Sequence, residues 1–588
     1  MFLATTALEE FWDKNQKIVF LGEWCKLYNR KDEWDKLAHE TLPYHWDDRK
    51  RLYGDYLYLN DVYEKVLAQL CITLNKFHNE NHTIRYWRII LGPWLYGFIE
   101  ILYDRYLSIC SAETSGKVTG TITARYDEGQ WTPKNTGEFN EWFKDDTYNH
   151  YLYSRVIELA SSLNYERKDI RNDCKHEDRP EHTSLLLKTI IKKILRTYTK
   201  IVPDYFNRIV FVTSYFDRND LALLQLSLRQ FPYLYYPEIE MSAPKVDFQK
   251  RKEICINDTN DEFLGLLNSL IPEQIPKCYM ESYGLLKKKA LHEFPSKPHI
   301  IFTANAHHSN EGFKVWAASC IEEGALFIGT QHGGFEGIGL WFPHEDHQIN
   351  IWDRYYSWGW KDASKESIKP FPSVKLNTVK KIRPDKNGRI LMVNTGFLRY
   401  SYYMQSMPVA SSGCETYLQG IFKFIHSLGE GPQKLLTVRL YPHDYQNCER
   451  ERFEQECPDI ECYLGKNSMY KQLQESRLFI GNANGTTYLE AFVANIPSLI
   501  FWNPDHWEIR ASAQPYFDKL RSVGIFHDTQ ESAAELVNKI YSDPIAWWQQ
   551  PQIQEAKDQV CHQFARTSER WLKEWKEELL GLELKWRK

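Results

Sequence analysis

A histidine and a glutamate lie in the glycine-rich segment Gly329-Thr-Gln-His-Gly-Gly-Phe-Glu-Gly337, which directly follows a short apolar run. Glycines on both sides allow the backbone to approach a ligand closely. His332 and Glu336 are therefore candidate catalytic bases that would take a proton from an attacking hydroxyl group. Which of these two residues is the base stays open. Neighbouring candidates for contact with a donor substrate are Gln331, Gly333 and Gly334.

A second segment, Gly481-Asn-Ala-Asn-Gly-Thr-Thr-Tyr-Leu-Glu490, lies between a predicted strand and a predicted helix. Such a loop offers unpaired backbone N–H groups and the positive end of the helix dipole, and both stabilise a phosphate. We expect the hydroxyl groups of Thr486 and Thr487 to contact phosphate oxygens. Helix capping by Asn484 or Thr486 is the structural alternative, and it is compatible with phosphate binding. Further donor-binding candidates are Asn484, Gly485 and Glu490, whose carboxylate is expected at the ribose hydroxyls.

A third segment, Arg439-Leu-Tyr-Pro-His-Asp444, ends another predicted strand. Proline fixes the exit of the chain from that strand, so Arg439 and His443 are expected near the carboxyl edge of the sheet, where open α/β folds bind ligands. Positive or hydrogen-bonding groups there would stabilise a departing phosphate. The segment therefore predicts two more donor-binding residues.

Two histidine-rich segments, His307-His308 and His344-Glu-Asp-His347, resemble metal ligands in composition only. Neither has the His-Glu-x-x-His spacing of a helix-borne zinc site. The sequence also has no Gly-x-Gly-x-x-Gly after its first strand and no Gly-Lys-Ser/Thr phosphate loop. We therefore expect no metal and no cofactor.

Strand and helix patterns alternate in two long series, and these must position the candidate residues. Strand, helix and strand at this spacing form βαβ units, whose loops open at the carboxyl ends of the strands. The predicted fold is α/β and GT-B-like, with two Rossmann-like domains facing each other across a cleft, helical insertions and a C-terminal helical tail. The predicted boundaries are 1–360 for the acceptor-side domain with an insertion at about 114–200, 361–387 for a linker, 388–545 for the nucleotide-sugar-binding domain, and 546–588 for helices packing back on the first domain.

Composition restricts the class of protein. A chain of 588 residues with 43% hydrophobic residues can fill more than one core. A formal net charge of -5 provides no overall positive potential that would attract nucleic acid or an anionic membrane. We therefore expect no nucleic-acid partner and at most peripheral membrane contact. The 12 cysteines contain no Cys-x-x-Cys pair, and the N-terminal segment lacks the pattern of a signal peptide. These features predict a cytoplasmic protein, with the inner face of the cytoplasmic membrane as the site of any membrane contact.

Four segments carry a resemblance to a known family. They are Leu42-Pro-Tyr-His-Trp-Asp-Asp-Arg49, Tyr86-Trp-Arg-Ile-Ile-Leu-Gly-Pro-Trp94, Gly329-Thr-Gln-His-Gly-Gly334 and Asp353-Arg-Tyr-Tyr-Ser-Trp-Gly359. In this order they resemble transferases of bacterial O-antigen and surface-polysaccharide biosynthesis loci. The resemblance runs nearly from end to end, and it implies an enzyme that acts on a glycan or lipid-linked glycan acceptor.

A wider similarity is to GT-B enzymes that transfer sialic acid or Kdo from CMP. In those enzymes an acidic motif, a His-Pro motif and a Ser/Thr pair surround the donor, and Gln331-His332-Gly333, Tyr441-Pro442-His443 and Thr486-Thr487 occupy the matching places here. Because histidine replaces the acidic residue and the His-Pro order is changed, the base and the CMP donor both stay open. The resemblance implies a metal-independent, inverting glycosyltransferase. A two-Rossmann nucleotide-sugar epimerase and a non-catalytic GT-B scaffold are the alternatives.

Overall fold

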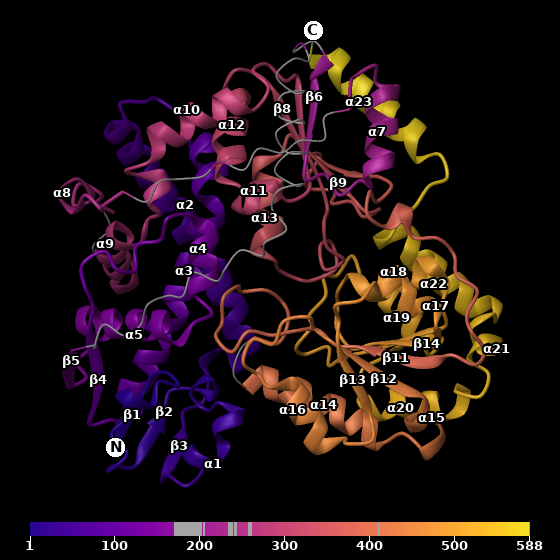
Figure 1. Ribbon diagram of the computed structural model, residues 1–588, viewed down its shortest axis with the longest axis horizontal. Helices are drawn as coiled ribbons and strands as arrows, with labels where there is room; N and C mark the ends of the chain where they lie inside the picture. Colours follow the sequence, from indigo (N-terminus) through magenta and orange to yellow (C-terminus); the bar gives the residue numbers. More distant parts are fainter. Residues whose placement is uncertain are drawn as a thin grey trace, which may run out of the picture.

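The computed structural model describes residues 1–169, 203, 206–232, 239, 244–256, 261–409 and 412–586. Its described strands form three sheets, and every strand pair within them is parallel. Helices flank the sheets, so the protein has the predicted α/β architecture with Rossmann-like units (Figure 1). Parallel strands joined by helices place their connecting loops at the carboxyl edge of each sheet, where ligands of such folds bind.

The first sheet has the order β3-β2-β1-β4-β5 and lies at the N-terminal end of the chain (Figure 1). Its central strands are short and apolar, and the three residues of β1 and of β2 are all buried. Elements of this part are β1 (Phe2–Ala4), η1 (Glu9–Phe11), β2 (Ile18–Phe20), η2 (Glu23–Cys25), η3 (Tyr28–Arg30), α1 (Lys31–Trp34), β3 (His39–Thr41), η4 (His45–Asp47), α2 (Arg49–His78), α3 (Ile84–Thr114), β4 (Gly120–Arg125), α4 (Thr136–Trp142), α5 (Asp146–Ala160) and β5 (Tyr165–Asp169).

Two long helices, α2 and α3, connect the first sheet with the rest of the molecule (Figure 1). The Asp48 side chain caps α2 by accepting hydrogen bonds from two backbone N–H groups, and Asn79 ends the helix in a left-handed conformation. Helix α3 continues through Pro93 and is buried along most of its length, because it packs against α2, α5, α12 and α13. It therefore forms the central support of the N-terminal half.

The second sheet has the order β10-β9-β8-β7-β6, with its strands side by side in chain order. Elements of this part are β6 (Ile209–Val212), α7 (Arg218–Ser227), α8 (Phe248–Arg251), α9 (Glu262–Gln274), η6 (Lys277–Tyr279), α10 (Tyr283–Glu293), β7 (Ile300–Thr303), α11 (Ala306–Ser309), α12 (Glu311–Glu322), β8 (Leu326–Thr330), α13 (Pro343–Ile351), β9 (Arg354–Ser357), β10 (Ile368–Pro370) and η7 (Leu376–Thr378). The glycine-rich segment with His332 and Glu336 begins at the carboxyl end of β8.

The third sheet has the order β13-β12-β11-β14-β15-β16. Its elements are β11 (Arg389–Val393), α14 (Ser412–His426), α15 (Glu430–Leu435), β12 (Leu436–Leu440), α16 (Glu449–Glu456), β13 (Glu461–Leu464), α17 (Met469–Gln474), β14 (Ser476–Gly481), α18 (Thr486–Ala494), β15 (Ser498–Phe501), α19 (Gln514–Ser522), β16 (Phe526–His527) and α20 (Gln530–Ile540). The strand order reverses between β11 and β14. In open α/β sheets this switch point is where ligands bind.

Three helices follow the third sheet: α21 (Pro544–Trp548), α22 (Pro551–Phe564) and α23 (Trp571–Trp586). Helix α22 packs against α18 and α19, so it belongs to the third unit, by which we mean the third sheet and the helices that pack on it. Helix α23 crosses to the second sheet and packs against α7, as Figure 1 shows in yellow beside magenta. An ion pair of 2.7 Å between Arg208 and Glu583 fixes that contact.

The structure differs from the sequence prediction in three places. Helix α22, which was predicted to pack back on the first domain with the rest of 546–588, packs against α18 and α19 instead. Residues 1–360 contain two separate sheets, and the stretch predicted as a helical insertion contributes β4 and β5 to the first of them. These strands are short, and the residues of β5 are exposed, so the sequence has no apolar run that would predict them. Residues 170–200 of that stretch lie outside the described residues. Within the predicted linker, β10 pairs with β9 and extends the second sheet.

Candidate functional site

The side chains of His332 and Glu336 lie in close contact after β8. The Nδ1 atom of His332 lies 2.7 Å from Oε1 of Glu336, and the His332 side chain is 23% exposed whereas that of Glu336 is fully buried. Glu336 Oε2 accepts hydrogen bonds from the Tyr355 hydroxyl at 2.7 Å and from the His332 backbone N–H at 3.2 Å. A buried carboxylate in this position fixes the orientation of the imidazole.

Further polar groups surround this pair. Gln348 Nε2 lies 3.2 Å from His332 Nδ1, and the rings of His332 and His344 are 4.9 Å apart. Glu345 accepts a hydrogen bond from the Gly337 N–H at 2.6 Å and pairs with Arg510 at 2.8 Å. Burial raises the pKa of Glu345 to about 7, and the Arg510 guanidinium lowers it in part. The segment 329–337 is thus held in place from α13, β9 and the third unit.

The two segments predicted to bind the donor meet directly. The Gly334 N–H donates a hydrogen bond of 2.9 Å to Oγ1 of Thr486. A Cβ atom on Gly334 would lie 2.7 Å from the Gly485 carbonyl oxygen and 2.9 Å from Leu489 Cδ1, so only glycine fits this approach. The loop with the candidate base therefore contacts the N-terminus of α18.

The N-terminus of α18 has free hydrogen-bonding capacity. Gly485 is the N-cap residue and no side chain caps the helix, so capping by Asn484 or Thr486 does not occur. Asn484 is 3% exposed, and its Nδ2 atom has no hydrogen-bond partner among the described residues. Unpaired N–H groups at a helix N-terminus bind anions. This end of α18 fits the predicted phosphate contact.

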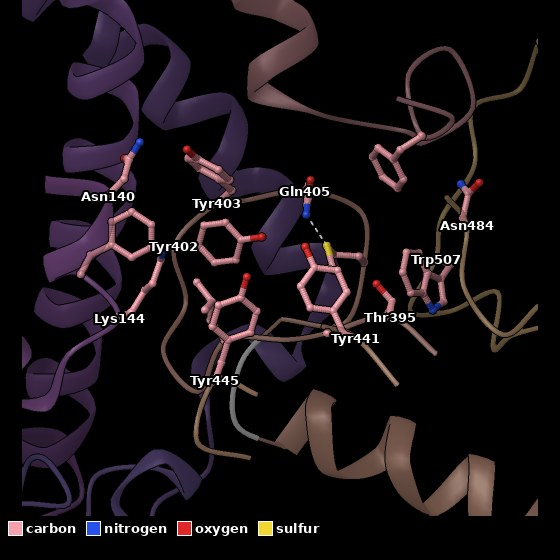
Figure 2. Close-up of a pocket in the computed structure, with 15 residues that line it drawn as sticks. Asn140, Lys144, Thr395, Tyr402, Tyr403, Gln405, Tyr441, Tyr445, Asn484 and Trp507 are labelled. Atoms are coloured by element: carbon pink, nitrogen blue, oxygen red, sulfur yellow. Dashed lines mark hydrogen bonds between the residues drawn. The ribbon is translucent and has the colours of Figure 1, made fainter. Parts of the chain in front are cut away.

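A pocket with a volume of about 400 Å³ opens beside Asn484. Its walls come from the α4–α5 region, from the loop with Phe335, and from the loops after β11, β12, β14 and β15. Figure 2 shows tyrosines between Asn140 and Lys144 on one side and Asn484 and Trp507 on the other. The lining residues are Asn140, Phe143, Lys144, Phe335, Thr395, Gly396, Leu398, Tyr402, Tyr403, Gln405, Met407, Tyr441, Tyr445, Asn484 and Trp507. Thr395, Gly396 and Asn484 place the pocket at the switch point between β11 and β14.

Several predicted residues lie away from this pocket. Arg439 Nη2 donates a hydrogen bond of 2.6 Å to the Gly465 carbonyl oxygen, and His443 is exposed in the loop after β12. Glu490 is paired with Lys375 at 3.5 Å, and burial raises the pKa of its carboxyl. Gln331 is fully buried and accepts hydrogen bonds from the Trp358 N–H and the Trp360 indole, so its side chain holds the loop. Of the predicted donor contacts, only Asn484 lines the pocket.

Sequence reasoning missed most of the pocket lining. The signal was the tyrosine-rich run Arg399-Tyr-Ser-Tyr-Tyr403, which follows the predicted strand Arg389–Val393. Asn140 and Lys144 carried no signal, because they belong to the N-terminal region that was read as an insertion. The segment His344-Glu-Asp-His347 resembled a metal site in composition only, yet one ligand atom each of His332, Glu336 and His344 lies within 4.8 Å of the others.

Comparison with known proteins now defines the class. The chain belongs to the LIC12162 family of transferases, whose model matches residues 1–579. The predicted resemblance to a transferase family is thereby confirmed, and family and fold together describe a transferase built from parallel α/β units. No curated protein sequence matches the chain.

Solved structures show distant similarity. Acinetobacter baumannii MurG is 11% identical, with 51% of this chain and 78% of that chain covered at a TM-score of 0.30. The glycosyltransferase WaaG, involved in lipopolysaccharide biosynthesis, is 12% identical, with 51% and 95% covered at a TM-score of 0.25. Anabaena Alr3699/HepE in complex with UDP-glucose is 9% identical, with 63% and 98% covered at a TM-score of 0.33.

Within the described part of the chain, none of the helices combines the length and apolar character needed to cross a membrane.

Proposed function

We propose that this protein is a glycosyltransferase that moves a sugar from a nucleotide-activated donor to a surface-polysaccharide or O-antigen acceptor. One observation carries the proposal: the Gly334–Thr486 hydrogen bond brings the His332–Glu336 loop to the N-terminus of α18, next to the pocket at the β11/β14 switch point. A candidate base and a phosphate site therefore face the same region. Displacement at an anomeric carbon needs both groups.

In this mechanism His332 acts as the base. The Glu336 carboxylate, with Oε1 2.7 Å from Nδ1 of His332, would hold a proton on that nitrogen, so that Nε2 would carry the lone pair that takes the proton of the acceptor hydroxyl. Glu336 itself is fully buried and bonded to Tyr355, which makes it a positioning residue. The acceptor oxygen forms its bond to the anomeric carbon as the bond to the donor phosphate breaks, so the configuration inverts.

The leaving phosphate takes up the negative charge. The N–H groups at the start of α18, the amide of Asn484 and the hydroxyls of Thr486 and Thr487 would stabilise it without a metal ion. The Thr486 hydroxyl accepts from Gly334 and keeps its own proton for a phosphate oxygen. Arg439 and His443 would act only after movement, since Arg439 must first exchange its bond to Gly465 for a phosphate contact.

The proposed donor is a CMP-activated nonulosonic acid or Kdo. Its support is the threonine pair at the start of α18 and the match of this segment to the Ser/Thr pair of CMP-using enzymes. UDP- and GDP-hexoses are the alternatives. The tyrosines and Trp507 of the pocket offer flat apolar faces on which a nucleobase or a pyranose ring would stack.

The test is a donor panel. CMP-, UDP- and GDP-sugars are titrated by calorimetry and then incubated with a lipid-linked glycan acceptor, and the products are analysed by mass spectrometry and NMR. Transfer with inverted configuration supports the proposal. Donor conversion without any acceptor would identify an epimerase, and lack of affinity for every nucleotide would identify a scaffold.

A further inference from the structure

Five histidines from three separate segments lie close together, and one of them is the candidate base His332. Ring centroids lie 4.9 Å apart for His332 and His344, 5.2 Å for His308 and His344, and 5.4 Å for His307 and His344. His347 joins this group with its ring centroid 5.9 Å from that of His307. Helices α11 and α13 therefore bring together the two histidine-rich segments that are far apart in the sequence. The proposed transfer reaction uses only His332 of this cluster.

Several polar atoms in the cluster are buried without hydrogen-bond partners in the described structure. These atoms include His344 Nε2 and both ring nitrogens of His347, in residues that are 6% and 4% exposed. An unpaired buried polar group costs roughly 1–3 kcal/mol, so such groups call for an ion or a water molecule.

The three residues have the donor set of a transition-metal site. One ligand atom each from His332, Glu336 and His344 lies within 4.8 Å of the other two. Two imidazoles and one carboxylate are ligands that Zn²⁺ accepts in its common tetrahedral sites, with a fourth position left for water or a substrate oxygen. Mg²⁺ and Ca²⁺ prefer oxygen ligands only.

Neighbouring groups already orient the ligands as metal sites require. The Tyr96 hydroxyl lies 3.2 Å from Nδ1 of His344, which leaves Nε2 free to bind an ion. The Tyr355 hydroxyl holds Glu336 at 2.7 Å. Such outer contacts fix the ring orientation and tautomer of metal ligands.

We propose that His332, Glu336 and His344 bind one Zn²⁺ ion, or another divalent transition metal of similar preference, and that the bound ion inhibits the enzyme. The ion takes the lone pair of the neutral His332 imidazole and also binds the carboxylate that orients it, so His332 no longer accepts a proton. The inhibition rests on the proposed function, whereas the binding does not. Transfer itself proceeds without metal.

The test measures binding and activity separately. The full-length protein is freed of metal with EDTA and dialysed, and Zn²⁺ is titrated by calorimetry, with Mg²⁺ as the comparison ion. We expect one Zn²⁺ per chain and a raised melting temperature, since an ion that binds only the folded state stabilises it. Mg²⁺ should show neither effect. Absence of Zn²⁺ binding by the wild-type protein would overturn the proposal.

Matched variants locate the site. His344→Gln and Glu336→Gln keep the approximate size of each side chain and remove one ligand, so each should weaken Zn²⁺ binding by at least about tenfold. The control His292→Ala changes a histidine side chain that is 71% exposed on α10 and should bind Zn²⁺ like the wild type. Unchanged Zn²⁺ affinity in both folded site variants contradicts the site. If His344→Gln fails to fold, Glu336→Gln decides alone.

The activity arm distinguishes this inference from the proposed function. Zn²⁺ should stop transfer in the wild type, EDTA should restore it, and His344→Gln should need at least about tenfold more Zn²⁺ for the same inhibition. Zn²⁺ bound at these residues without loss of transfer would contradict the inhibitory role only. Absence of transfer in every condition, with Zn²⁺ still bound, would contradict the proposed function and leave the metal site intact.

Discussion

The backbone N–H of Gly334 donates a hydrogen bond of 2.9 Å to Oγ1 of Thr486, a residue of the third unit. This bond joins the loop of the candidate base to the helix of the candidate phosphate site. Because the Gly485 backbone lies directly against Gly334, the two loops are fitted to each other closely. The relative position of base and donor therefore depends on this contact.

Gly334→Ala should disrupt the contact. Its Cβ would lie 2.7 Å from a backbone oxygen that cannot move alone, so the free energy of unfolding should fall by about 1–3 kcal/mol. Gly333→Ala is the matched control for stability, because no atom lies within 4 Å of the added Cβ. Chemical denaturation of both variants measures the difference. Equal stability of the two variants would mean that the loops do not meet as described.

Thr486→Ala combined with Thr487→Ala should weaken nucleotide binding by at least about tenfold, because hydrogen bonds to a charged phosphate are worth about 1.5–3 kcal/mol each. Loss of the Gly334 bond should lower stability by only about 1 kcal/mol. Calorimetry with the donor nucleotide measures the affinity, and the melting temperature serves as the folding control. Wild-type affinity in the folded double variant would remove this helix from the donor site.

Transfer activity should survive EDTA. The leaving phosphate is stabilised in our proposal by the start of α18 and its hydroxyl and amide groups, none of which needs a metal ion. Initial rates before and after exhaustive chelation are the measurement. Complete loss of activity, restored by Mg²⁺ or Mn²⁺, would contradict the proposed leaving-group chemistry and direct attention to Glu345 and Asp346.

His150 should make the fold sensitive to acid. It is 1% exposed, its Nδ1 lies 2.8 Å from the Tyr126 hydroxyl, and burial lowers its pKa to about 3. The folded state therefore keeps His150 neutral while the unfolded chain binds a proton below its ordinary pKa of about 6.5. Its contribution to stability is present above that pH and is lost as the pH falls towards 3.

The measurement compares His150→Phe with the wild type by denaturant titration at about pH 7.5 and about pH 5.5. Between these two pH values the free energy of unfolding of the wild type should fall by about 1.4 kcal/mol more than that of the variant. Phenylalanine preserves the stacking with Phe11, whose ring centroid is 4.0 Å from that of His150. Equal pH dependence of the two proteins would show that His150 is accessible to protons in the folded state.

Much of the fold could be predicted from apolar periodicity. The strand Arg389–Val393, the helix Thr486–Ala494 and the strand Ser498–Phe501 have the predicted bounds, because each is buried and clearly bounded by turn residues. Most of the first sheet was not predicted. β1 and β3 have three residues each, too few for a periodic pattern, and β5 is exposed.

The candidate site was predictable where the chemistry lies in one segment. His332 with Glu336, and Thr486 with Thr487, could be selected because each pair follows a strand within a polar loop. The pocket and the histidine cluster depend on contacts between distant segments. Tyr403 and His308, for example, are 95 residues apart and have their polar atoms 3.1 Å apart. A single sequence contains no information on such pairs.

The most direct test of the catalytic role is the turnover of His332→Ala, measured with its donor affinity. The lost interaction develops only in the transition state, so kcat should fall by about 10²- to 10⁴-fold while donor affinity stays nearly unchanged. Glu336→Ala should have a milder effect, because it orients the base. A larger loss in Glu336→Ala would transfer the role of base to the carboxylate. If neither variant lowers kcat by at least about tenfold, the 329–337 loop is structural and the proposed mechanism is wrong.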